Sequence, residues 1–244
     1  MVIPAFAEYE DACKLHDHRV SFILWNQLKA GEIPAADLLF ICNPNNPTGE
    51  VFVDLEHLIK DNANILFVVD EAFIEFTLSI TSVVELVRNY ANLVVLRSMT
   101  KAYAVPGLRL GYIVAQPALI NLFRAVKQPW SVNVMALETG HFIFDQSALI
   151  TLPIQQMLND KADFIAALAS APLLIHHSHT HFFLAETKVG LAAELKIFLL
   201  KEFNLLIRDA GNFRGLGPQF VRIATLSPAK NKLLINALSE WRPI

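Results

Sequence analysis

Three polar side chains follow a short apolar run at fixed spacing near the middle of the chain. Ser98, Lys101 and Arg109 lie at offsets of three and eight residues within the segment VVLRSMTKAYAVPGLRLGY. A lysine amine can bond covalently to an aldehyde, and a hydroxyl and a guanidinium can hold a phosphate. This spacing predicts a site for a phosphorylated aldehyde cofactor, and pyridoxal phosphate is the cofactor of that kind.

Two polar residues upstream supply the remaining contacts. Asn46 lies in an Asn-Pro-Thr-Gly turn, and Asp70 follows the apolar run 65–69. Pyridoxal chemistry needs a carboxylate that keeps the pyridine nitrogen protonated, so that the ring can accept electrons, and a donor to the ring hydroxyl. Each residue alone has an ordinary explanation as a turn residue, a helix cap or a surface charge. The ordered set favours a cofactor site.

The elements that must position these groups are short apolar runs alternating with amphipathic segments, which is typical of an α/β fold. We expect strands at residues 20–24, 37–42, 65–69, 93–96 and 110–115, with helices at 6–16, 54–60, 83–89, 117–127 and 132–144. Three of the strands end at the polar groups named above. Because the carboxyl ends of parallel strands meet at one edge of a sheet, we expect those groups to lie together.

A domain boundary is expected near residues 145–152. Beyond it we predict helices at 154–169, 191–203 and 230–241, and strands at 173–175, 182–185, 205–208 and 220–224. This pattern indicates a compact α+β layer. The predicted organisation is a large domain at 1–148 and a small C-terminal domain at 149–244.

The composition narrows the class of protein. The chain has 244 residues, is 54% hydrophobic and carries a formal net charge of −3. No apolar run approaches the roughly 18–20 residues that span a bilayer, and no basic run stands out, so we predict neither a membrane nor a nucleic-acid partner. Cys13 and Cys42 form no CxxC pair, and the first residues lack the basic region of a signal peptide. Both features favour a reducing, cytoplasmic location.

The motifs resemble those of the fold-type I aminotransferases. Asn-Pro-Thr-Gly, then Asp-Glu-Ala, then Ser-x-x-Lys with an arginine eight residues later is the pattern of that superfamily. The longer segments CNPNNPTGEVF, VVDEAFIEF and LRSMTKAYAVPGLRLGY are most similar to those of the L-threonine-O-3-phosphate decarboxylases of cobalamin biosynthesis. Further likeness lies in PWSVN at 129–133 and in IRDAGNFRGLGPQFVRIAT at 207–225. The resemblance implies a pyridoxal-phosphate-dependent large domain with a mostly parallel sheet, followed by a small α+β domain.

The resemblance implies a role for each residue that matches the cofactor motifs. Lys101 would form the Schiff base with pyridoxal phosphate, and Asp70 would pair with the pyridine nitrogen. Asn46 would contact the ring hydroxyl and the substrate. Ser98 and Arg109 would hold the cofactor phosphate.

The same resemblance implies the substrate contacts. Arg222 would bind the substrate carboxylate, and Arg208 would line the same pocket and meet the substrate phosphate. Phe73 would lie beside the cofactor. In the sister group, the histidinol-phosphate aminotransferases, we expect a tyrosine at this position, and its hydroxyl would donate to the ring hydroxyl of the cofactor. The missing hydroxyl favours a decarboxylase over an ordinary aminotransferase.

The function expected from these residues is decarboxylation of L-threonine O-3-phosphate to (R)-1-amino-2-propanol O-2-phosphate, by a homodimer. One alternative is a histidinol-phosphate or related aminotransferase, which would transfer the amino group to 2-oxoglutarate. Another is a non-catalytic fragment of the same fold. Compared with the family pattern, we expect the chain to lack an N-terminal segment with a glycine-rich phosphate loop, a ring-stacking aromatic and dimer contacts. Apolar surface that this segment covers should then be exposed.

A histidine cluster at His176, His177, His179 and His181 raises the question of a metal site. Alternate spacing along a strand would place the last three on one face. However, no cysteine or paired carboxylate joins them, and structural metal sites draw on such ligands. The sequence therefore predicts no metal site.

Overall fold

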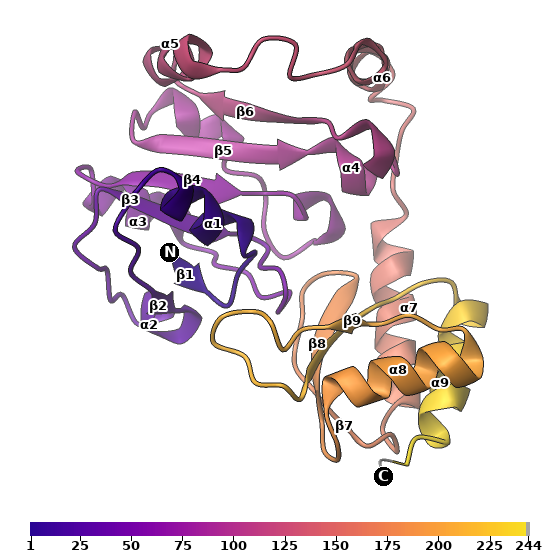
Figure 1. The fold of residues 1–244 in the computed structure, drawn as a ribbon. Helices are drawn as coiled ribbons and strands as arrows, with labels where there is room; N and C mark the ends of the chain where they lie inside the picture. Colours follow the sequence, from indigo (N-terminus) through magenta and orange to yellow (C-terminus); the bar gives the residue numbers. More distant parts are fainter. Residues whose placement is uncertain (243–244) are drawn as a thin grey trace.

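A computed structural model of the chain, which describes residues 1–242, contains two main sheets with separate cores (Figure 1). The larger sheet has the order β3-β4-β5-β6, with bounds Leu38–Cys42, Leu66–Asp70, Leu93–Ser98 and Gly111–Ala115. The first three strands are parallel, and β6 is antiparallel to β5. Their sequences are nearly continuous apolar runs because both faces of the sheet are covered.

The larger sheet is surrounded by helices and short turns. A separate parallel pair joins β1 (Val2–Ile3) to β2 (Ile23–Leu24). In Figure 1, α5 and α6 lie next to β6, on the side of the molecule away from the second sheet. The helices are α1 (Glu8–Leu15), α2 (Trp25–Lys29), α3 (Leu55–Asp61), α4 (Met99–Ala102), α5 (Pro117–Val126) and α6 (Val134–Asp145), and the 3-10 turns are Ile74–Phe76, Val84–Arg88 and Pro106–Leu108.

The second sheet is antiparallel throughout and has the order β7-β8-β10-β9. Its own core contains the fully buried side chains of Phe183, Leu195 and Val221. Helices α7, α8 and α9 supply the rest of that core. The strands are Leu173–Ile175, Phe182–Thr187, Phe220–Ala224 and Arg208–Asp209 for β7, β8, β10 and β9, and the helices are Ile154–Ala167, Ala192–Phe203 and Pro228–Ser239.

The two sheets meet at a turn that requires glycine. Gly49 has φ +72°, and a Cβ atom there would lie 2.0 Å from the Oγ atom of Ser178. The backbone N–H of His179 donates to the carbonyl oxygen of Gly49 at 2.8 Å. The Asn-Pro-Thr-Gly turn therefore packs directly against the segment that joins β7 to β8, and this contact brings the two sheets together beside β3.

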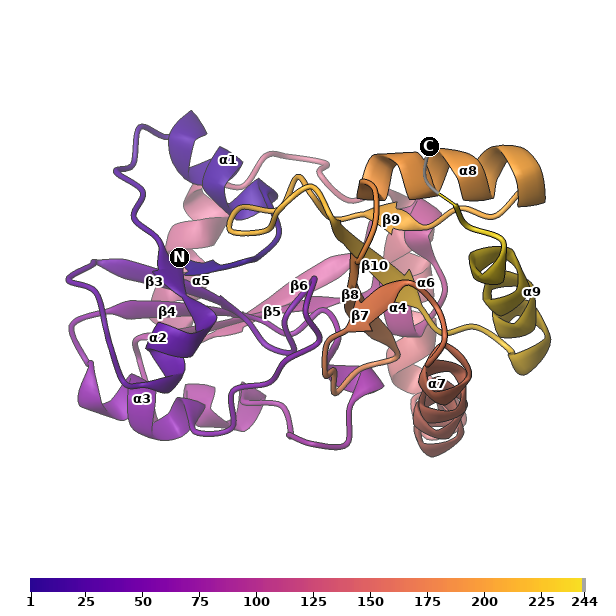
Figure 2. The same ribbon diagram turned by 90° about the horizontal axis from the view of Figure 1, so that it is seen from below.

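A second bridge joins the β9–β10 connection to α1. Arg214 donates from Nε and Nη2 to the two carboxylate oxygens of Glu10, at 2.7 and 2.6 Å. The guanidinium also lies 4.3 Å from the centroid of the Phe22 ring. Figure 2 shows this connection reaching across toward α1.

The fold class agrees with the sequence prediction, whereas several boundaries were wrong. The strand expected at 20–24 is only Ile23–Leu24, because its partner β1 offers only two residues for pairing. The helix expected at 83–89 is a 3-10 turn at Val84–Arg88, a form common in short pieces. The strand expected at 205–208 is instead Arg208–Asp209, because Asn204 ends α8 in the left-handed region at φ 55° and the chain must first cross to the sheet.

The histidine segment is also not a strand. β7 ends at Ile175 and β8 begins at Phe182, so His176–His181 form the connection between them and share no strand face. Within residues 1–242, no group of three or more His, Cys, Asp and Glu side chains is placed to hold a metal ion. None of the helices in this range is long and apolar enough to cross a membrane.

Candidate active site

The carboxyl ends of β3, β4 and β5 open onto a cavity of about 590 Å³ between the two sheets. Each sequence-predicted site residue lines this cavity. Those from the larger sheet and its loops are Asn46, Asp70, Phe73, Ser98, Lys101 and Arg109, and those from the smaller sheet are Arg208 and Arg222. Parallel strand order places the first group at one edge, as expected for ligand sites in α/β sheets.

Asp70 is the buried carboxylate of the site. It ends β4, and its Oδ1 atom accepts a hydrogen bond from the backbone N–H of Ala72 at 2.9 Å. The hydroxyl of Tyr9 donates to its Oδ2 atom. Burial raises the pKa of Asp70, and the hydrogen bonds from Tyr9 and Ala72, together with the charge of Lys101, act in the opposite direction. The carboxylate is thus fixed in orientation by two donors.

Lys101 lies on α4, one turn after β5. The Ser98 side chain caps this helix by accepting from the N–H of Thr100, and the Ser98 and Thr100 hydroxyls lie 2.8 Å apart. Burial, followed by the charges of Arg109 and Arg222, lowers the pKa of the Lys101 ammonium, whereas Asp70 opposes this shift. A lowered pKa increases the fraction of neutral amine, which is the form that attacks an aldehyde.

Arg109 reaches the same wall through a strained turn. Its backbone lies in the left-handed region at φ 55°, directly after the 3-10 turn Pro106–Leu108. The Nη1 atom donates to the carbonyl oxygen of Pro106 at 3.1 Å. This turn joins α4 to β6, and Arg109 lines the same cavity as Ser98 and Thr100. The guanidinium can pair with a phosphate.

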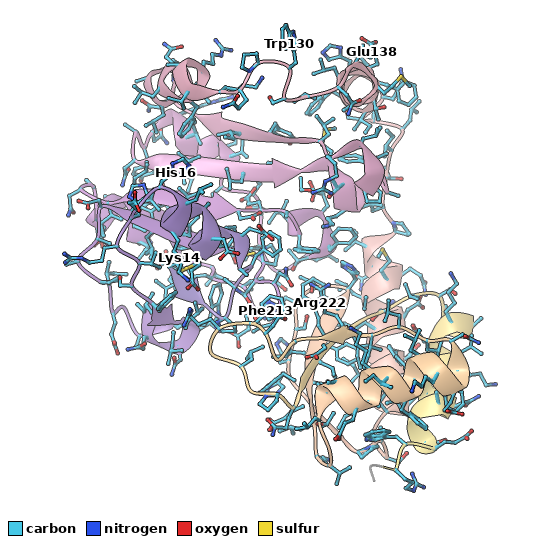
Figure 3. All side chains as sticks on the ribbon, viewed as in Figure 1. Lys14, His16, Trp130, Glu138, Phe213 and Arg222 are labelled. Carbon is cyan, nitrogen blue, oxygen red and sulfur yellow. The ribbon has the colours of Figure 1, made fainter. Side chains whose placement is uncertain are left out.

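Arg222 and Arg208 come from the second sheet, where they face each other across β10 and β9. Arg222 donates from Nη1 to the Oδ1 atom of Asn46, and this bond crosses between the sheets. Arg208 donates to the Oδ1 atom of Asn212 at 2.9 Å. Burial, followed by the charge of Arg208, lowers the pKa of Arg222. Figure 3 shows Arg222 and Phe213 at the junction of the two halves.

Several cavity residues were missed in the sequence analysis. Phe6 and Tyr9 line the wall, although the resemblance placed the ring-stacking aromatic in a preceding segment. Their spacing of three residues at the start of an amphipathic helix was the available signal. Thr100 and His181 also line the cavity. The sequence marked His181 only as a member of the histidine cluster, because its place in the cavity depends on how the β7–β8 connection packs.

The other histidines lie away from the cavity. The rings of His177 and His179 are 4.5 Å apart, and the Nδ1 atom of His179 lies 2.7 Å from the hydroxyl oxygen of Ser79.

Phe73 is buried against the rings of Phe76 and Phe182. Its side chain supplies an apolar wall.

The donor set fits pyridoxal phosphate. It combines one amine of lowered pKa, a buried carboxylate for the pyridine nitrogen, and hydroxyl groups and a guanidinium in the same cavity for the phosphate. Since the Asn46 amide oxygen already accepts from Arg222, its NH₂ group is left to meet the ring hydroxyl. The cavity also lies within the range of about 300–1,000 Å³ that is usual for small-molecule sites.

Comparisons with known proteins agree with this geometry. Residues 1–238 match the family described as aminotransferase class I and II. The threonine-phosphate decarboxylase of Salmonella typhimurium is 33% identical over 98% of this chain and 69% of that protein. The L-threonine-O-3-phosphate decarboxylase structure from Porphyromonas gingivalis has a TM-score of 0.93 and 42% identity, covering 98% of this chain and 74% of that one.

An aminotransferase structure is also similar. The histidinol-phosphate aminotransferase from Clostridium acetobutylicum has a TM-score of 0.88 and 30% identity, covering 98% of this chain and 75% of that one. Both kinds of relative are pyridoxal-phosphate enzymes, and both are named for a phosphorylated substrate. The chain therefore belongs to the aminotransferase class I and II family of pyridoxal-phosphate-dependent enzymes.

Proposed function

We propose that the chain decarboxylates L-threonine O-3-phosphate to (R)-1-amino-2-propanol O-2-phosphate, a reaction of cobalamin biosynthesis. Pyridoxal phosphate, when bound, supplies an electron-accepting ring that stabilises negative charge on the substrate Cα. Lys101 would hold the cofactor covalently, and Asp70 would pair with its pyridine nitrogen. Asn46 would meet the ring hydroxyl, while Ser98 and Arg109 would hold its phosphate.

The observation that carries the proposal is the facing pair of arginines. Arg208 and Arg222 stand directly opposite each other on antiparallel strands, and both line the cavity that contains Lys101 and Asp70. Like charges directly opposite each other destabilise a sheet. A substrate with two anionic groups offsets this repulsion, and a phosphorylated amino acid has a carboxylate and a phosphate. We assign the carboxylate to Arg222, which is half-buried beside Asn46, and the phosphate to Arg208, which is exposed.

The residues of the chain then divide the reaction between them. Arg222 orients the substrate so that the bond from Cα to the carboxylate is the one that breaks, and carbon dioxide leaves while the electron pair stays on Cα. Lys101 returns a proton to Cα, and burial lowers its pKa, which makes the ammonium a stronger acid for this transfer. Phe73 contributes no hydroxyl to this wall.

The test is product analysis with the purified chain and added pyridoxal phosphate. We expect carbon dioxide and the amine phosphate from phosphothreonine, and loss of both products in the Arg222→Met variant. Release of 2-oxo acid without carbon dioxide would contradict the proposal.

A second candidate is a histidinol-phosphate aminotransferase, because a structure of that enzyme is 30% identical to this chain over 98% of its length. The same cofactor residues would serve it, and a different bond of the substrate would break. Amino transfer from histidinol phosphate to 2-oxoglutarate distinguishes the two. A non-catalytic fragment would show neither reaction, even with bound cofactor.

We further propose that each chain is organised as a large domain at 1–148 and a small domain at 149–244. We also propose that the protein is a homodimer and that it is located in the cytoplasm. Cys13 and Cys42 are unpaired thiols, which suits a reducing compartment. Exposed apolar side chains gather on α5, α6 and the segment between them, including Leu122, Trp130 and Phe142, and such patches mark contact surfaces. In Figure 3, Trp130 lies on the outer side of this region. Sedimentation of the purified chain tests the dimer.

A further inference from the structure

The ring of His181 is held rigidly at the cavity wall. Its centroid lies 4.1 Å from that of Phe76 and 5.3 Å from that of Phe182. The centroid of the Phe73 ring lies 6.2 Å away. The backbone is also fixed, because the carbonyl oxygen of His181 accepts from the N–H of Thr225 at 2.8 Å. The imidazole is therefore a pre-positioned group.

The two ring nitrogens of His181 have different surroundings. Nδ1 is buried and has no hydrogen-bond partner among residues 1–242. Nε2 is not among the buried atoms that lack a hydrogen-bond partner, and the ring lines the cavity, so Nε2 is the nitrogen that is available to a ligand there. A buried N–H without a partner is costly, so the neutral ring carries its proton on Nε2. It thus presents one hydrogen-bond donor to the cavity.

The ring is also uncharged at neutral pH. Burial lowers the pKa of His181 to about 4, and the charges of Arg222 and Lys161 act in the same direction. His181 can therefore donate a hydrogen bond into the cavity without also bringing a full positive charge.

Arg222 is the cationic side chain near the His181 donor. Its guanidinium carbon lies 5.2 Å from the centroid of the Phe182 ring, against which His181 also packs. The charge of Arg222 also acts on the His181 ring, and both side chains line the same cavity, so an anion held by Arg222 lies near this ring. Arg208, the residue paired with Arg222 across the strands, lies instead against the ring of Phe213.

We propose that the Nε2–H group of His181 donates a hydrogen bond to the substrate carboxylate beside Arg222, and so makes His181 a residue that recognises this carboxylate. The inference rests on the proposed function. It explains why a neutral donor stands there. A carboxylate loses its negative charge as carbon dioxide leaves, so a second cation would stabilise the substrate more than the transition state. A neutral donor also orients the carboxylate, and it slows decarboxylation less than a second cation would.

The experiment compares two ligands that differ in the carboxylate. His181→Phe keeps an aromatic ring among Phe73, Phe76 and Phe182 but removes the donor. We expect the KM for phosphothreonine to rise about ten- to hundred-fold, the loss of one hydrogen bond to a charged group. The inhibition constant of 1-amino-2-propanol O-2-phosphate, which has no carboxylate, should change less than twofold.

Two further variants separate a lost donor from a disturbed fold. His181→Gln can place an amide N–H near the Nε2 position and should recover most of the affinity. His181→Asn reaches only as far as Nδ1 and should behave like His181→Phe. Equal weakening of both ligands in all three variants, or an unchanged KM in His181→Phe, overturns the inference.

A nitrogen NMR measurement on the ¹⁵N-histidine-labelled chain tests the inference without any reaction. We expect His181 to be a neutral ring with its proton on Nε2, and a proton on Nδ1 would refute the assignment. If the wild-type chain neither converts phosphothreonine nor binds the amine phosphate, the proposed function fails and this inference fails with it. If the wild type is active and His181→Phe binds both ligands normally, only the inference fails.

Discussion

Replacement of Tyr9 by phenylalanine tests how much the Tyr9 hydrogen bond stabilises the ionised form of Asp70. The Tyr9 hydroxyl donates to Asp70, and this bond opposes the rise in the Asp70 pKa that burial causes. A hydrogen bond to a charged group contributes about 1.5–3 kcal/mol, and one pKa unit corresponds to about 1.4 kcal/mol. Tyr9→Phe should therefore raise the Asp70 pKa by about one to two units.

The assay is the dissociation constant of pyridoxal phosphate between pH 5 and 9. A protonated Asp70 cannot pair with a protonated pyridine nitrogen, so affinity should fall as pH drops through the Asp70 pKa. In Tyr9→Phe this fall should begin about one to two pH units higher than in the wild type. Tyr90→Phe is the matched control, because the Tyr90 hydroxyl bonds only to the exposed carboxylate of Glu56. Superimposable profiles for Tyr9→Phe and the wild type would refute the reasoning.

Two further predictions concern how the halves of the molecule are joined. Gly49→Ala should lower the free energy of unfolding by about 2–4 kcal/mol, since φ is +72° and the new Cβ atom meets Ser178. Gly31→Ala, at φ +81° with open space around it, should cost only about 1 kcal/mol in the same denaturant titration, and equal losses would contradict the packing argument. The Glu10 pKa is lowered from 4.5 to about 2, and the hydrogen bond from Arg214 is the main cause. The pair therefore stabilises the fold fully above pH 4.5, and this contribution to the free energy of unfolding is lost as the pH falls toward 2. Glu10→Gln should flatten the dependence of unfolding free energy on pH in that window, and an unchanged slope would show that the pair contributes nothing.

The sequence predicted which residues of the larger sheet lie together at the cavity, because their positions depend on local structure. Asn46, Asp70 and Ser98 each follow a strand whose apolar run is visible, and parallel strands must bring their carboxyl ends together. Lys101 and Arg109 follow within one short helix and one turn. The strand ends thus determine this wall of the cavity.

The remaining walls depend on packing between distant segments, which no local pattern encodes. His181 reaches the cavity only because Gly49 lets the β7–β8 connection approach the Asn-Pro-Thr-Gly turn. Tyr9 belongs to the site because α1 packs so that its hydroxyl meets Asp70 from 61 residues away. The short strand at Arg208–Asp209 was misplaced for a similar reason, since its position depends on pairing with β10. These contacts are tertiary and override local propensity.

The most direct test of the account is covalent capture of pyridoxal phosphate by the purified chain. After addition of the cofactor and reduction with borohydride, peptide mass spectrometry should locate the added mass on Lys101. Lys161 is the internal comparison, because burial also lowers its pKa although it lies outside the cavity. A label on Lys101 that disappears in Lys101→Ala is the predicted result. A label spread over several lysines, or equal labelling of Lys161, would contradict the assignment of this cavity as the cofactor site.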